Sequence, residues 1–150
     1  DVDQEAIKYA ILNHKPPFVG YICTSGEETG LDDESVDVVV SFETLEHVPD
    51  DYALLREFYR ILKRNGLLIC SVPNNWEISR LHLRSYDRKK LEKLLGSFFS
   101  DMVFYNQNSG QKSALHNHGQ PAGICLTTDE NENLAECYIV VCRKDNISLR

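Results

Sequence analysis

The sequence has 150 residues, 42% of them hydrophobic, so it is long enough for one domain with a buried core and too short for two of average size. Its 23 acidic and 16 basic side chains give a formal net charge of -7, with no dense lysine and arginine cluster, which disfavours nucleic acid as a partner. The apolar runs fall far short of a membrane span, so we expect a soluble chain.

The cysteines favour a reducing environment. Their number is odd, they include no Cys-x-x-Cys pair, and three lie in strand-like apolar segments where a thiol packs as a small hydrophobe. We therefore expect a cytoplasmic location for a chain with these five cysteines: Cys23, Cys70, Cys125, Cys137 and Cys142.

The first elements are a short helix and two strands. Apolar residues recur at helical spacing from Ala6 to Ile11, after an acidic start and before Pro16-Pro17, which ends the pattern. Residues 18–24 are a compact apolar run that predicts a strand followed by a loop. Residues 36–42 lack alternation, which predicts a central parallel strand covered by helices on both faces.

The clearest helix begins at Pro49-Asp50-Asp51 and has a continuous apolar face. Lys63-Arg64 suit its C-terminal dipole, and Asn65-Gly66 predict a left-handed cap. Residues 67–72 are a further apolar strand. Strand, helix and strand in this order predict a right-handed parallel crossover.

The remaining elements complete an open α/β sheet. Asp87 predicts the cap of a third helix that runs to Gly96, and a strand follows over residues 98–105. Residues 106–136 are polar and predict a long loop within the single domain. Residues 137–142 predict a buried final strand. Ligands of such sheets usually bind at the carboxyl ends of the strands.

The segment at residues 37–50, DVVVSFETLEHVPD, resembles the fourth strand and following turn of class I S-adenosylmethionine-dependent methyltransferases, in the branch that contains quinone-biosynthesis enzymes. The similarity extends through residues 54–73 and 82–86, and residues 1–10 look like the end of the family's second strand and the helix behind it. This resemblance implies a Rossmann-like sheet that lacks its first strands and has an antiparallel C-terminal strand. Residues 1–150 would form one incomplete domain.

The resemblance also implies S-adenosylmethionine as cofactor. Asp1 falls where the family's acidic residue accepts hydrogen bonds from the ribose, and Ser25-Gly26 fall at the adenine edge. Phe42 and Glu43, at the end of a strand, are further expected cofactor contacts. Ser25 is a departure, because a hydroxyl replaces an anionic acceptor and should bind the adenine amine less strongly.

The family's first strand and Gly-x-Gly-x-Gly loop have no counterpart in these residues. That strand would lie beside residues 36–42, so we expect a long apolar edge with unpaired backbone groups. Dimerisation, exchange of elements, or inward movement of residues 18–24 would cover it. A homodimer is the expected assembly.

Glu43, Glu46 and His47 are spaced i, i+3 and i+4, and His82 is a potential fourth ligand. The set resembles the metal site of small-RNA 2′-O-methyltransferases, where the metal orients the acceptor hydroxyl. Carboxylate and imidazole together suit Mg, Mn or Zn. His47 could instead act as a general base. In a purely structural alternative, Glu46 and His47 fix the turn and His82 is a polar loop residue.

Three other residues allow both a functional and a structural interpretation. His116 and His118 form a His-x-His pair, but without an acidic or thiol partner nearby they are expected to be solvated loop histidines. Trp76 lies where the family forms its acceptor pocket, or it covers the core.

The leading hypothesis is therefore methyl transfer to an oxygen or nitrogen of a small or prenylated acceptor. The alternative is a catalytically inactive methyltransferase-like remnant that associates with itself or binds a partner. A nucleotide-dependent oxidoreductase is disfavoured, because it would not explain the Leu45-Glu46-His47-Val48 turn.

Overall fold

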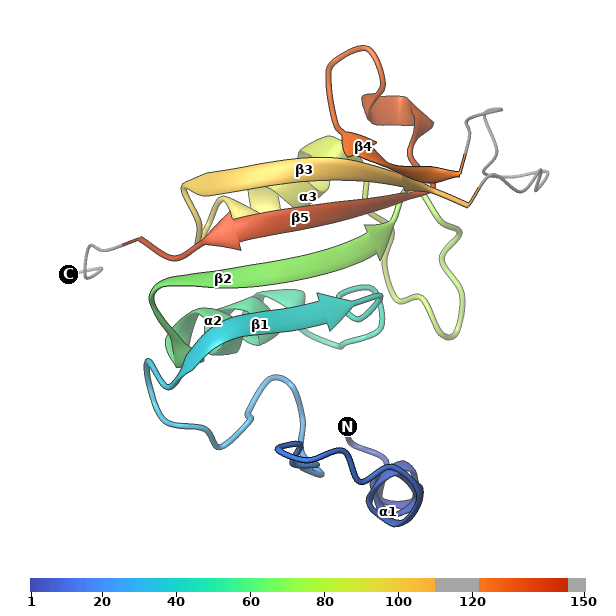
Figure 1. Cartoon of the computed structure of the whole chain (residues 1–150). Coiled ribbons are helices and arrows are strands. Elements are labelled where there is room, and N and C mark those ends of the chain that lie inside the picture. Colours follow the sequence, from blue (N-terminus) through green and yellow to red (C-terminus); the bar gives the residue numbers. More distant parts are fainter. Residues whose placement is uncertain (110–121, 146–150) are drawn as a thin grey trace.

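The computed structural model describes residues 1–109 and 122–145. Within these ranges one five-stranded sheet has the strand order β1-β2-β5-β3-β4 (Figure 1). No helix in this part of the chain is both long and apolar enough to cross a membrane. The elements, in chain order, are α1 (Gln4–Asn13), β1 (Val36–Phe42), α2 (Asp51–Ile61), β2 (Leu62–Pro73), α3 (Arg88–Leu95), β3 (Asp101–Asn108), β4 (Gly123–Leu126), the 3-10 helix η1 (Glu132–Leu134) and β5 (Cys137–Arg143).

The sheet is mixed, as predicted. β1 and β2 are parallel and are connected through α2. β5 lies between β2 and β3 and is antiparallel to both. The α/β class and the antiparallel C-terminal strand are therefore confirmed.

An aspartate caps each of the three α-helices of the described residues. The side chain of Asp3 accepts hydrogen bonds from the backbone N–H groups of Glu5 and Ala6, and Asp50 accepts one from Ala53. Asp87 accepts one from Lys90, which confirms its predicted role as a cap. These bonds satisfy donors that have no partner inside a helix, so they fix where each helix begins.

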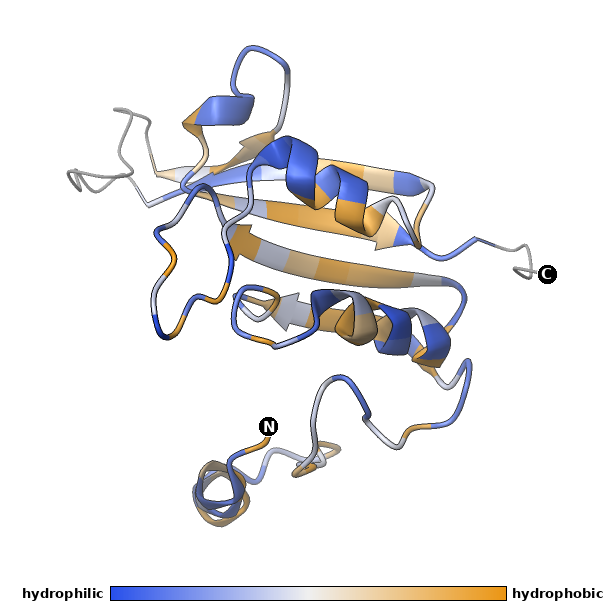
Figure 2. Ribbon diagram, turned by 180° about the vertical axis from the view of Figure 1, so that it is seen from behind, coloured by the Kyte–Doolittle hydropathy of each residue, from blue (hydrophilic) through white to orange (hydrophobic). Residues whose placement is uncertain are grey.

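Both α2 and α3 cover the same face of the sheet. They lie behind the strands in Figure 1 and in front of them in the reverse view of Figure 2. The core lies between these helices and the strands. It contains Leu54 and Leu55 of α2, Leu91 of α3, and Cys70 and Val140 of the sheet, all fully buried.

No helix of the described residues covers the opposite face. An apolar row crosses that face, because the strand register aligns Val40, Ile69, Val141 and Val103. Val40 is 58% exposed. The expectation that helices cover both faces of residues 36–42 is therefore wrong for the described chain, and β1 lies at the edge of the sheet instead of its centre.

Residues 18–24 do not form the predicted strand. Phe18 has a positive φ of 69°, which interrupts extended backbone. The segment bonds to the chain start instead: the Thr24 N–H donates to the Asp1 carbonyl, and the Asp1 amino group donates to Ile22. Residues 18–24 have therefore not moved inward to pair with β1.

The Asn65-Gly66 cap prediction is also wrong. α2 ends at Ile61, and Leu62 is already extended as the first residue of β2. Asn65 has a φ of 62°, and the register jumps from Val36↔Leu62 to Val38↔Leu67, so these residues form a bulge inside β2. A left-handed Asn before Gly suits a bulge as well as a helix cap.

The predicted loop over residues 106–136 contains strand structure. β3 continues to Asn108, and β4 pairs with it in antiparallel register. The polar Asn106 is buried because its amide donates to the Asn131 carbonyl and its oxygen accepts from the Thr127 hydroxyl. A polar residue therefore occupies a buried position of β3, so the end of this strand lacks the apolar alternation that would have predicted it. His116 and His118 lie outside the described residues.

Candidate functional site

A cavity of about 800 Å³ lies between the N-terminal segment and the start of α2. Its wall includes Asp1, Ser25, Gly26 and His47. Three of the five predicted cofactor residues and the predicted catalytic histidine thus share one cavity, of a volume usual for ligand sites. Phe42 and Glu43, the other two predicted cofactor residues, do not line it.

Local contacts fix the cofactor-side wall. The Asp1 carboxylate accepts a hydrogen bond from the Asp3 backbone N–H at 2.9 Å. The Ser25 hydroxyl accepts one from the Glu27 backbone N–H at 3.2 Å. A Cβ at Gly26 would lie only 2.7 Å from Leu54 Cδ1, so packing against α2 also requires a small residue here.

The turn after β1 separates Glu43 from the other predicted metal ligands. Glu43 has a φ of 49°, and its Oε1 accepts a hydrogen bond from the Ser71 hydroxyl at 2.6 Å. The other three candidates converge: one donor atom each from Glu46, His47 and His82 lie within 4.8 Å of one another. Glu43 is not part of this cluster.

Glu46 is buried, and its carboxylate lacks hydrogen bonds from the described residues. It is 2% exposed. Burial is the main cause that raises the pKa of Glu46 above its ordinary value. Its Oε1 lies 3.7 Å from His47 Nε2, and the buried Nδ1 of His82 likewise has no partner in the described chain. Buried polar atoms of this kind call for a ligand or proton as an explanation.

The contacts of His47 define its tautomer. Its Nδ1 lies 2.7 Å from the carbonyl oxygen of Leu81, which can only accept a hydrogen bond. Nδ1 must therefore carry the proton, and Nε2 of the neutral ring keeps a lone pair on the side of Glu46. That nitrogen can accept a proton or coordinate a metal ion.

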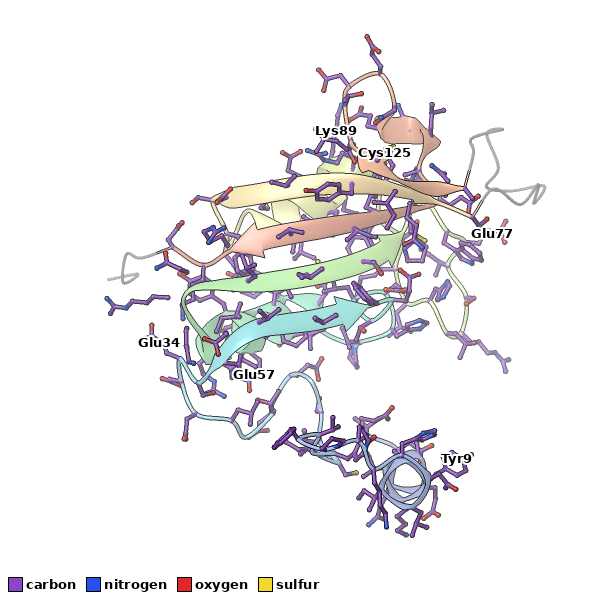
Figure 3. All side chains as sticks on the ribbon, in the orientation of Figure 1. Tyr9, Glu34, Glu57, Glu77, Lys89 and Cys125 are labelled. Atoms are coloured by element: carbon purple, nitrogen blue, oxygen red, sulfur yellow. The ribbon has the colours of Figure 1, made fainter. Side chains whose placement is uncertain are left out.

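Hydrogen bonds connect the loop that carries His82 to the turn that carries Glu46. The Leu83 N–H donates to the Glu46 carbonyl at 2.8 Å. The Arg84 guanidinium donates to three turn carbonyls, those of Leu45, Val48 and Pro49. This loop, marked by Glu77 in Figure 3, lies at the carboxyl end of β2.

Trp76 belongs to the same loop and faces the site. Its ring contacts that of His82 edge-on, with the centroids 5.9 Å apart. It remains 43% exposed, so it covers the core at most in part. Its role in acceptor binding stays a prediction.

A second cavity, of about 640 Å³, lies at the opposite end of β1, where Figure 3 marks Glu34 and Glu57. Its charged side chains bind one another: Arg60 donates to Glu57 at 2.8 Å and also pairs with Asp33. These groups satisfy each other and stabilise the loop before β1, so we assign this cavity a structural role.

Comparison with known proteins agrees with the geometry. The family model described as a methyltransferase domain, type 11, matches residues 1–70. A Mycobacterium tuberculosis protein named "Probable S-adenosylmethionine-dependent methyltransferase" is 33% identical over 102 residues, covering 63% of this chain and 37% of that protein. A ubiquinone biosynthesis O-methyltransferase of Parvibaculum lavamentivorans is 30% identical over 76 residues, covering 49% of this chain and 30% of that protein.

Among solved structures, an S-adenosylmethionine-dependent methyltransferase from Archaeoglobus fulgidus superposes with a TM-score of 0.68 at 16% identity, over 96% of this chain and 74% of that one. The fold and the turn at residues 37–50 are thus those of class I S-adenosylmethionine-dependent methyltransferases. Within that class, residues 1–70 match the type 11 methyltransferase-domain family. The chain spans 37% of the length of the mycobacterial relative. These similarities favour the methyltransferase family over the oxidoreductase alternative.

Proposed function

We propose that this protein transfers the methyl group of S-adenosylmethionine to an oxygen or nitrogen of a small-molecule acceptor. The observation that supports this most is the shared cavity, with Asp1, Ser25 and Gly26 on one part of its wall and His47 on another. The Asp1 carboxylate can accept from ribose hydroxyls, and the volume accommodates a nucleoside with its side chain.

The reaction makes few demands on the protein. The cofactor, when bound, supplies an electrophilic methyl group, and the chain must align the acceptor and remove one proton. Nε2 of His47 takes that proton in our proposal. The nearby Glu46 carboxylate then stabilises the imidazolium that forms.

The surroundings of His82 support an apolar acceptor, small or prenylated. Trp76, Leu81 and Leu83 on the same loop are 43%, 74% and 46% exposed. The ubiquinone biosynthesis name of one relative agrees with such a substrate. The five free thiols fit the reducing, cytoplasmic setting that we propose.

Nuclear magnetic resonance locates the cofactor site directly. We expect S-adenosylhomocysteine added to isotope-labelled protein to shift the amide resonances of Gly26, Thr44 and Val48, which line the cavity. Leu91, buried in α3, should not shift. Asp1→Asn should weaken the effect. Unchanged spectra, or shifts confined to residues outside the cavity, would contradict the proposed function.

The same cluster can hold a divalent metal ion, which we propose as an alternative role for His47. Glu46, His47 and His82 offer one carboxylate and two imidazoles, and that donor set favours Zn or Mn over Mg. The bond from His47 Nδ1 to Leu81 is the outer contact that metal-bound histidines usually make. A metal here would orient the acceptor hydroxyl.

Thermal unfolding tests the metal. We expect Zn²⁺ or Mn²⁺ to raise the Tm of the wild-type chain and of His14→Ala, whose histidine lies on the N-terminal segment. His82→Ala should lose this stabilisation. Equal Tm values with metal and with chelator in the wild-type chain would leave His47 with the general-base role alone.

A second candidate function, self-association, is favoured by the face and the edge of β1, which no other described element covers. Antiparallel pairing of two β1 strands about Val39 would place Val38 opposite the partner's Val40. It would also place Val36 opposite the partner's Phe42, so the apolar face would continue across the dimer. Val38, Val40 and Phe42 are 47%, 58% and 55% exposed.

Light scattering distinguishes a dimer from a monomer. We expect the wild-type chain to be a dimer and Val40→Lys to be a monomer, because the lysine would replace the apolar contact with the partner's Val38 and place two like charges on one face near the pairing centre. Asp37→Lys on the same strand, whose side chain pairs with Lys63, is the matched charged control. A monodisperse wild-type monomer would exclude self-association.

A further inference from the structure

The cavity wall contains a carboxylate that the sequence did not single out. Among its described lining residues only Asp1 and Glu27 are acidic. The adenosine part of the proposed cofactor has two kinds of hydrogen-bond donor, the ribose hydroxyls and the exocyclic amine. The Asp1 carboxylate suits the ribose hydroxyls. If Ser25 alone faced the exocyclic amine, that amine would have no anionic acceptor.

Glu27 lies close to that position. Its Oε2 is 3.4 Å from the Ser25 hydroxyl, and the Glu27 N–H donates to the same hydroxyl. Its Oε1 accepts from the Asp50 backbone N–H at 3.1 Å. A carboxylate has about four lone-pair positions, so these two contacts fix the group and leave acceptor capacity free.

We propose that Glu27 supplies the anionic acceptor for the exocyclic amine of S-adenosylmethionine, in the role that Ser25 cannot fill. This inference rests on the proposed function. The alternative is structural: Glu27 only ties the turn at Ser25 to the start of α2 through Asp50. The two differ in whether Glu27 discriminates between ligands with and without the amine.

Equilibrium dialysis with two probes separates these roles. The probes are S-adenosylhomocysteine and its analogue with hydrogen in place of the 6-amino group. We expect the wild-type chain to prefer the amine-bearing probe about tenfold, the size of one hydrogen bond to a charged group. Glu27→Gln should lose this preference. Glu28→Gln, at a neighbouring acid outside the cavity, should keep it.

Rescue adds a second criterion. In the Glu27→Gln background, Ser25→Asp returns a carboxylate to the same turn and should restore the preference. Equal weakening of both probes by Glu27→Gln, or a wild-type chain that binds both equally, overturns the role of Glu27 and leaves cofactor binding intact. A folded wild-type chain that binds neither probe overturns the proposed function itself.

Discussion

Glu46 shows at the level of one residue that the candidate site costs stability. Because burial raises its pKa above the ordinary 4.5, the ionised carboxylate disfavours the folded state at neutral pH. We expect Glu46→Gln to raise the free energy of unfolding at pH 7 by more than the roughly 0.5 kcal/mol typical of surface changes. The gain should shrink as the pH falls from the raised pKa through 4.5, and it should be absent well below 4.5, where the folded and unfolded carboxyls are both protonated. Urea unfolding at pH 7 and at pH 3 measures the difference, and a loss at pH 7 would contradict the account.

For Glu57 we expect the opposite effect, because removal of its charge should lower the free energy of unfolding. Its hydrogen bond to Arg60 is the main cause that lowers its pKa to about 2, with Thr29 contributing further bonds. The ionised form therefore stabilises the fold, and this stability is lost as the pH falls from 4.5 towards 2. We expect Glu57→Gln to cost roughly 2–3 kcal/mol at pH 7. The exposed Glu28→Gln is the control, and an equal effect from both changes in urea unfolding would rule out this role.

The residues of the site were only partly predictable from sequence. Resemblance grouped Glu46, His47 and His82, and the structure places one potential ligand atom of each within 4.8 Å of the others. It could not separate Glu43 from them, because that depends on a left-handed φ and a bond to Ser71 on another strand. Glu27 was missed because its place in the wall depends on a long-range contact with the start of α2.

At the scale of elements, the bulge in β2 depends on Gly66. A Cβ there would lie 2.8 Å from the Lys63 carbonyl and 3.0 Å from the Asp37 carbonyl, and backbone atoms yield little. We expect Gly66→Ala to destabilise the chain by about 1–3 kcal/mol. Gly20→Ala, where nothing lies within 4 Å, should change the free energy of unfolding far less. Similar losses at both sites would show that the close approach is not the cause.

Elements with a local signal were predicted well. Aspartate caps and apolar periodicity identified α2 and α3, and unbroken apolar runs identified β1 and β5. The predictions failed where contacts with residues distant in the sequence determine the secondary structure. Residues 18–24 have strand composition but no ladder, whereas β4 is exposed along its length and is held by pairing with β3.

At the scale of the whole molecule, two features point to different uses of the same fold. The helices cover one face of the sheet and leave the apolar row through Val40 uncovered in the described residues. The cavity lies between the N-terminal segment and the start of α2, and its wall contains proposed cofactor residues and His47. Self-association and cofactor binding are therefore separable, and the second carries the proposed activity.

Calorimetric titration of S-adenosylmethionine into the chain tests that activity most directly. We predict one-to-one binding with a Kd below about 1 mM, which corresponds to roughly 4 kcal/mol. Asp1→Asn should weaken it. A chain that unfolds cooperatively, and is thus folded, but gives no binding heat at this concentration would contradict the account and favour the self-association alternative.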